Sequence, residues 1–160
     1  LVKLTNQDAD AAIAARPDIL PGELVFTSLK ETPLVFIAPR SHPDAVIRAK
    51  QGIDWEKTQL IIPDHGISRD RIDKWFAKEN FVPNIYSQVA GNEAIIVMVS
   101  LGCGIGLVPK MVLEKSPVRT RVDILEGTPG LPPFIIGLCT RKKNLKNPRV
   151  DALWRIANDI

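Results

Sequence analysis

Two hydrophobic patterns alternate along the chain. Short apolar runs predict β-strands, and apolar residues spaced three or four positions apart predict amphipathic helices. A continuous apolar run between two prolines, residues 33–39, predicts a strand covered on both faces. The expected strands are residues 9–15, 23–30, 33–39, 59–63, 84–89, 104–109, 121–125 and 134–140.

Helices are expected between these runs. Ser68 and Asn92 are each predicted to be the N-cap of a helix, because their side chains can accept hydrogen bonds from a first turn. The second of these helices, residues 93–101, is apolar all round and is expected to be buried, with Gly102 at its C′ position. Further helical segments are predicted from Pro109 at N1 to Leu113, at residues 150–157 and at residues 1–4.

Strands and helices that alternate at these lengths favour an α/β fold with mostly parallel sheets, in which the helices form the crossovers. Residues 1–4 resemble the end of a helix that no strand precedes. We therefore expect the chain to be truncated at its N-terminus.

The composition is that of a folded protein. The chain has 160 residues, 45% of them apolar and 24% charged, which is enough for one domain or two small lobes. A net charge of +3 is too small to indicate a nucleic-acid binder. Two cysteines are too few for a disulfide scaffold and favour the cytoplasm. No apolar run reaches the 18 or so residues of a membrane span.

Several candidate chemistries are not supported by their context. Gly102, Gly104 and Gly106 follow a helix and precede a strand, which is the reverse of the dinucleotide-binding order, so a helix end and a tight turn are expected. The two histidines and two cysteines lack the spacing of a metal site. Ser68, His65 and Asp64 lack a nucleophile elbow, so no catalytic site is predicted.

Two loops carry the best candidate for ligand binding. Residues 63–68 (PDHGIS) and 90–94 (AGNEA) each join a strand to a helix start, where backbone N–H groups favour an anion. Loops of this kind open on the same carboxyl edge of an α/β sheet. Plain turns and caps explain both segments equally well. The basic stretch 141–149 has no aromatic residue for stacking on bases and is expected to be a solvated loop.

Two long segments resemble the effector-binding domain of LysR-type transcriptional regulators. They are DAAIAARPDILPGELVFTSLKETPLVFIAPRSHP and NEAIIVMVSLGCGIGLVP, and the likeness extends over essentially the whole chain. The segments PDHGISRDRIDKWF, LEKSPVRTRV and LCTRKKN are most similar to the branch of the family that activates branched-chain amino acid biosynthesis.

The resemblance implies an α/β fold of two Rossmann-like lobes of periplasmic-binding-protein type II, joined by two crossover strands. Lobe I would be residues 1–38 plus 134–160, incomplete at its N-terminus, and lobe II residues 39–133. The winged helix-turn-helix DNA-binding domain of the family would be absent. A small organic acid, acetolactate or acetohydroxybutyrate, would bind in the cleft between the lobes. The implied ligand-binding residues are His65, Gly66, Ile67, Ser68, Arg69, Asn92, Glu93, Ala15, Arg16 and Pro39.

The resemblance further implies a cytoplasmic sensor that is not an enzyme and needs no cofactor or metal. Arg16 or Arg69 would pair with the carboxylate of the acid. The effector domains would form a homodimer, the full-length protein a tetramer, and DNA would be bound only through the absent N-terminal domain. The alternative is a solute-binding protein of a transport system.

Overall fold

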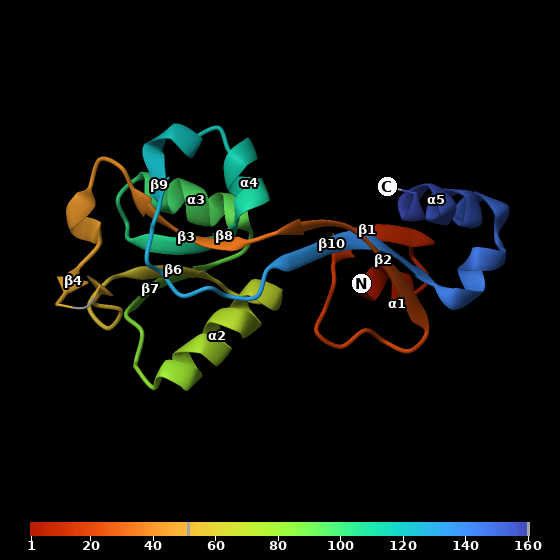
Figure 1. Cartoon of the computed structure of the whole chain (residues 1–160), viewed down its shortest axis with the longest axis horizontal. Helices are drawn as coiled ribbons and strands as arrows, with labels where there is room; N and C mark the ends of the chain where they lie inside the picture. The colour runs from red at the N-terminus through yellow and green to blue at the C-terminus, as the bar shows by residue number, and fades with distance from the viewer. Residues whose placement is uncertain (51, 160) are drawn as a thin grey trace. The chain divides into compact units, whose positions relative to one another are not determined.

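The computed structural model describes residues 1–50 and 52–159 and contains five α-helices and ten strands among them (Figure 1). The helices are α1 (Val2–Thr5), α2 (Ile67–Glu79), α3 (Asn92–Ser100), α4 (Lys110–Lys115) and α5 (Pro148–Asn158). The strands are β1 (Ala11–Ala15), β2 (Leu24–Thr32), β3 (Leu34–Pro39), β4 (Arg48–Ala49), β5 (Gly52–Ile53), β6 (Leu60–Pro63), β7 (Ile85–Val89), β8 (Ile105–Pro109), β9 (Val122–Ile124) and β10 (Phe134–Arg141). Short 3-10 helices lie at Pro43–Ala45, Arg119–Arg121 and Lys142–Lys146.

The chain divides into two compact units. Unit 1 consists of Leu1–Thr32 and Phe134–Ile160, and unit 2 of Pro33–Pro133. The first boundary lies at Thr32, whereas the sequence placed it after Ala38. The difference arises because β3 pairs along its length with β8 and β9, which makes it a strand of unit 2.

Unit 1 is a three-stranded sheet with the order β1-β10-β2, and both pairings are antiparallel. Its core is small, with Leu4, Leu24 and Cys139 buried together. The register of β10 shifts between Ile136 and Gly137. A Cβ atom at Gly137 would lie 2.1 Å from the Thr27 carbonyl oxygen, so the close approach of β2 requires glycine there.

Unit 2 contains a five-stranded sheet, in the order β7-β6-β8-β3-β9, with helices on both faces, and a two-stranded sheet of β4 and β5 (Figure 1). Successive residues of a strand point to opposite faces, so Ile37 and Ile61 pack with α3 while Phe36 packs with Trp75 of α2. Gly106 of β8 lies under α3, and its Cβ would come within 2.5 Å of the Ile95 side chain. The buried run of β3 is thus explained by cover on both faces, as predicted.

The expectation of mostly parallel sheets is wrong. Only β6 is parallel to its neighbours β7 and β8, whereas β3 is antiparallel to β8 and β9, and the sheet of unit 1 is entirely antiparallel. The physical reason is that β3 enters unit 2 directly from β2 without a crossover helix. Two neighbouring strands are parallel only where the connection between them, usually a helix, carries the chain back to the edge of the sheet at which the first strand began.

Several predicted helix ends are confirmed and others are wrong. Gly102, with φ of 88°, follows the C-cap Leu101, and Gly104 turns the chain into the fully buried β8, as predicted. Pro109 is the residue before α4 rather than its first residue. The expectation that α3 is buried all round is wrong: Val97 within the helix is 42% exposed, because only one side of the helix packs on the sheet.

The basic stretch is not a simple solvated loop. Arg141 ends β10 and is only 6% exposed, and the lysines that follow form a 3-10 helix. The acidic neighbour of Arg141 is Asp10, whose Oδ1 lies 4.0 Å from the guanidinium. The stretch therefore contributes a buried strand end as well as exposed charge.

Candidate functional site

Two helices of unit 2 begin side by side at one edge of its sheet. The last residues of β6 and β7, Pro63 and Val89, are partners in the parallel register. The next backbone N–H, that of Asp64, donates to the Val89 carbonyl at 3.1 Å. Helices α2 and α3 follow these strands after short turns, so both N-termini lie at the same edge. We call residues 64–68 and 90–93 together the helix-start edge.

Glycines, and not the predicted polar residues, are the N-caps of both helices. Gly66 has φ 88° and ψ −174°, Gly91 has φ 86° and ψ 139°, and neither helix has a side-chain cap. Ser68 and Asn92 lie inside the helices, so their prediction as caps is wrong. The glycines take backbone conformations that polar capping residues rarely adopt, because a Cβ atom is strained at such φ values.

The missing side-chain caps leave the first-turn N–H groups of both helices available. These groups carry the positive ends of the helix dipoles. A Cβ built at Gly66 or Gly91 meets no atom within 4 Å, so there is open space in front of each cap. Asp70 and Glu93 in the first turns offset part of the positive potential. The edge can therefore accept a single carboxylate on backbone donors.

Side chains of the first loop differ sharply in exposure. The His65 side chain is 81% exposed, and its Nδ1 lies 2.6 Å from Asp64 Oδ1. Ser68 is only 5% exposed, and its hydroxyl makes no hydrogen bond within the described part of the chain. Ile67 is half-buried. The histidine and the aspartate meet, but no bond joins them to Ser68, so the three residues do not form a triad.

The Arg69 guanidinium already has three partners within the chain. Its Nε lies 2.7 Å from Asp73 Oδ2, and its Nη1 donates to the Pro63 carbonyl at 3.2 Å and to Gln88 Oε1. These contacts tie α2 to the ends of β6 and β7. They favour a role for Arg69 in positioning the helix-start edge over direct pairing with a ligand.

The second loop contributes the start of α3. Asn92 is half-buried and Glu93 is exposed, and both lie in the first turn. Sequence reasoning overlooked Gly91 as the matching cap and Gln88 as the partner of Arg69. The signal for Gly91 was present, since both loops have a glycine between a strand and a helix start.

Pro39 is not part of this edge. Because β3 is antiparallel to β8, Leu34 pairs with Pro109 near the helix-start edge, and Pro39 pairs with Val122 at the opposite end of the strand. The expected crossing near Pro39 is therefore wrong: unit 2 begins at Pro33. Pro39 is buried at the end of β3 that is farthest from the helix-start edge.

Ala15 and Arg16 belong to unit 1. Ala15 ends β1 opposite Ile136, and the Arg16 N–H donates to the Ile135 carbonyl at 2.8 Å. The exposed Arg16 guanidinium carbon lies 5.8 Å from the centre of the Phe26 ring, at the distance of a cation–π contact.

Residues 1–50 and 52–159 contain no group of three or more His, Cys, Asp or Glu side chains placed to hold a metal ion. Within the same residues no helix has the length and apolarity to cross a membrane. Both cysteines are free thiols, Cys139 buried and Cys103 partly so, and burial raises the pKa of the Cys139 thiol.

Comparison with known proteins matches the whole described chain to one family. The family model described as "LysR substrate binding domain" covers residues 1–159. The HTH-type transcriptional activator IlvY of Salmonella typhimurium is 41% identical over 160 residues, which cover 96% of this chain and 54% of that protein. The HTH-type transcriptional regulator IlvY of Escherichia coli is also 41% identical, over 96% of this chain and 53% of its own length. The chain thus spans about half the length of the curated relatives it matches.

A solved structure supports the same assignment. The effector-binding domain of QuiR, in complex with shikimate, has a TM-score of 0.76 and 25% identity, covering 99% of this chain and 74% of that chain. The relatives are transcriptional regulators, and the family model describes a binding domain and not an enzyme, as the sequence predicted. The family match over residues 1–159, together with these relatives, shows that the chain belongs to the LysR family of transcriptional regulators as a substrate-binding domain.

Proposed function

We propose that this domain binds a small organic acid at the helix-start edge and thereby controls transcription of branched-chain amino acid biosynthesis. The observation that carries the proposal is the pair of adjacent helix N-termini without side-chain caps. They lie at strand ends joined through Pro63 and Val89. Backbone donors at such a position suit a carboxylate, since charge-assisted hydrogen bonds are stronger than neutral ones.

The side chains around the edge suit an acid that also carries hydroxyl or keto oxygens. Ser68 has a hydroxyl without a partner among the described residues, and Asn92 can both donate and accept. The QuiR domain was solved with shikimate, which is a hydroxylated carboxylic acid. The resemblance to the branch of the family that activates branched-chain amino acid biosynthesis favours acetolactate and acetohydroxybutyrate, each with a carboxylate, a keto oxygen and a hydroxyl.

The remaining predicted residues take different places in the proposal. Gly66 and Ile67 contribute backbone N–H groups, and His65 and Glu93 flank them on the exposed side. Ala15 and Arg16 stay proposed contacts from unit 1, with the exposed Arg16 guanidinium as a partner for a carboxylate. That proposal rests on the family resemblance.

Control of transcription would follow from unequal binding. The acid can shift the regulator only if it binds one arrangement better than another. In this proposal the change on ligand binding is passed to a DNA-binding domain elsewhere in a longer cytoplasmic protein.

A second copy of the domain is the proposed partner. Val97 and Leu101, 42% and 62% exposed on one side of α3, support such pairing, and Leu101→Lys should shift sedimentation toward the monomer.

A thermal-shift titration tests the ligand proposal. A ligand present at 100 times its Kd adds about 2.7 kcal/mol to the free energy of unfolding. For a domain of this size that raises the Tm on the order of 5–10 °C. We expect acetolactate and acetohydroxybutyrate to raise the Tm. Valine and isoleucine, which have an ammonium group and neither the hydroxyl nor the keto oxygen, should leave it unchanged.

Matched serine variants locate the effect. Ser68→Ala removes the hydroxyl at the helix-start edge and should weaken the ligand-dependent shift. Ser116→Ala removes another buried serine hydroxyl without a partner, at the end of α4, and should preserve the shift. Equal shifts in the two variants, or no shift of the unmodified chain with either acid, would overturn the proposed site.

A further inference from the structure

Five of the nine aromatic side chains gather on the α2 face of unit 2. Trp75 is at the centre of this cluster. The Trp55 ring centre lies 4.8 Å from that of Trp75 at an interplanar angle of 82°, and the Phe81 ring centre lies 5.1 Å away at 70°. Both neighbours thus stand nearly perpendicular to Trp75. The cluster also contains Phe36 and Phe76.

A cavity of about 330 Å³ opens beside these rings. It is lined by Trp55, Trp75 and Phe81, together with Glu79 and Pro129. Trp75 is only 7% exposed and its ring packs against the other rings of the cluster, so the accessible aromatic surface at the cavity belongs mainly to the half-buried Trp55 and Phe81. An aromatic ring can attract an organic cation that lies over its face.

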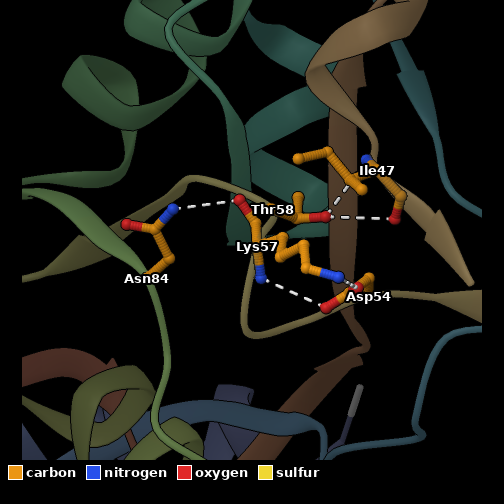
Figure 2. Close-up of polar contacts among 5 residues, drawn as sticks. All are labelled: Ile47, Asp54, Lys57, Thr58 and Asn84. Carbon is orange, nitrogen blue, oxygen red and sulfur yellow. Dashed lines mark hydrogen bonds and ion pairs between the residues drawn. The ribbon is translucent and has the colours of Figure 1, made fainter.

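The turn that carries Trp55, residues 54–58, is held by a network of hydrogen bonds, which Figure 2 shows. Thr58 is fully buried, and its hydroxyl accepts from the Ile47 N–H at 3.1 Å and donates to the Ile47 carbonyl at 3.2 Å. Asp54 accepts from the Lys57 N–H and from its Nζ at 3.2 and 2.9 Å. Asn84 donates to the Lys57 carbonyl at 2.9 Å. The turn that carries Trp55 is therefore fixed before any ligand arrives.

The part of the lining around Pro129 is anchored as well. Arg71 of α2 is buried and donates from Nη1 to the carbonyls of Pro132 and Pro133, each at 2.8 Å. These bonds hold the segment that contains Pro129 against α2. A preformed site loses less entropy on binding than one that must be assembled.

Among the described residues that line the cavity, the charged one is Glu79. Glu79 is the last residue of α2, where the helix dipole places its negative end. Its carboxylate makes no ion pair within the described part of the chain, and the basic residue of the last turn is the exposed Lys78. A carboxylate and ring faces both attract cations, and neither attracts the organic acids proposed for the helix-start edge.

We propose that this cavity binds a small organic ammonium ion, such as a quaternary or primary amine cation. The 12 residue steps from Ile67 to Glu79 place it ~18 Å along α2 from the helix-start edge. It is thus a second site of opposite charge preference, and it stands independently of the acid-binding proposal. The rings supply cation–π attraction and the carboxylate supplies charge.

Tryptophan fluorescence tests the proposal with choline as the probe, because Trp55 and Trp75 line the cavity. The neutral control is 3,3-dimethyl-1-butanol, which has the same shape without the charge, and ionic strength is kept constant with sodium chloride. We expect a saturable change in fluorescence with choline and none with the alcohol. An equal response to both probes, or no saturable response to choline up to tens of millimolar, would overturn the proposal.

Variants separate binding from folding. Glu79→Gln should raise the Kd for choline at least about threefold, while Phe81→Leu removes one wall and should raise it similarly. Glu114→Gln, a glutamate of α4 that pairs with Lys110, should leave the Kd unchanged. Far-UV circular dichroism confirms that each variant folds. A folded Glu79→Gln protein with the Kd of Glu114→Gln would show that the carboxylate does not act on the cation.

Discussion

Replacing Gly66 by alanine should strain the start of α2 without any collision. The residue has φ 88° and ψ −174°, a region that is populated almost only by glycine. A Cβ atom built there meets nothing within 4 Å, so the cost of Gly66→Ala lies in the backbone alone. Holding a residue in such a region costs about 1–3 kcal/mol.

Gly130 provides the matched control. A Cβ atom placed on Gly130 also meets open space, but the φ of this residue is outside the left-handed range. Gly130→Ala should be neutral, or should stabilise the protein by about 0.4–1 kcal/mol by restricting the unfolded chain. The two substitutions add the same methyl group in the same unit, so their difference isolates the backbone strain.

Urea unfolding followed by circular dichroism measures the difference. Gly66→Ala should lower the free energy of unfolding by about 1–3 kcal/mol and the Tm by roughly 2–12 °C. It should also reduce the thermal shift with acetohydroxy acids, because the strained cap moves the first-turn N–H groups. Equal stabilities of Gly66→Ala and Gly130→Ala would refute the assignment of strain to this cap.

Two further perturbations test the polar network of Figure 2. Thr58→Val leaves the Ile47 N–H without its partner, although the Ile47 carbonyl still accepts from the Asp54 N–H at 2.8 Å. The loss should cost about 1–3 kcal/mol in urea unfolding. Thr5→Val removes an exposed hydrogen bond to the Val2 carbonyl and should change stability by less than about 0.5 kcal/mol. Similar losses in both variants would contradict the network's role. The hydrogen bond from Lys57 lowers the pKa of Asp54 in the folded protein. The ionised Asp54 therefore stabilises the fold at pH values above the ordinary carboxyl pKa, and this contribution is lost as the pH falls through the folded-state pKa. Between about pH 6 and about pH 2.5 the free energy of unfolding should therefore fall less in Asp54→Asn than in the unmodified chain, and equal falls would exclude the pair's contribution.

The candidate site was predictable where local chemistry decides it. Both loops of the helix-start edge were found from strand, glycine and helix patterns within a few residues. The identity of the caps was not, because Ser68 and Asn92 are common capping residue types. Whether they or the preceding glycines cap the helix depends on the path by which the chain leaves the sheet.

The aromatic cavity shows the opposite case. Trp75 and Phe76 recur with Ile72 at helical spacing, and all three are buried on one face of α2. Trp55 and Phe81 lie outside that helix, one before it and one after it in the sequence, and no periodicity links them to Trp75. Trp55 reaches Trp75 because Thr58 holds the turn that carries it, and the pattern of hydrophobic residues gives no sign of that turn.

The sequence by itself determined the positions of the main strands and helices, the cover on both faces of β3 and the family resemblance. These features depend on residues that are close together or on motifs in order along the chain. The tertiary structure decided strand direction, the boundary at Thr32 and the far-edge position of Pro39. It also decided that α2 and α3 begin together, through the Pro63–Val89 register. The physical reason is that strand pairing is a contact between distant segments, and its direction and register are selected by the packing of the whole sheet.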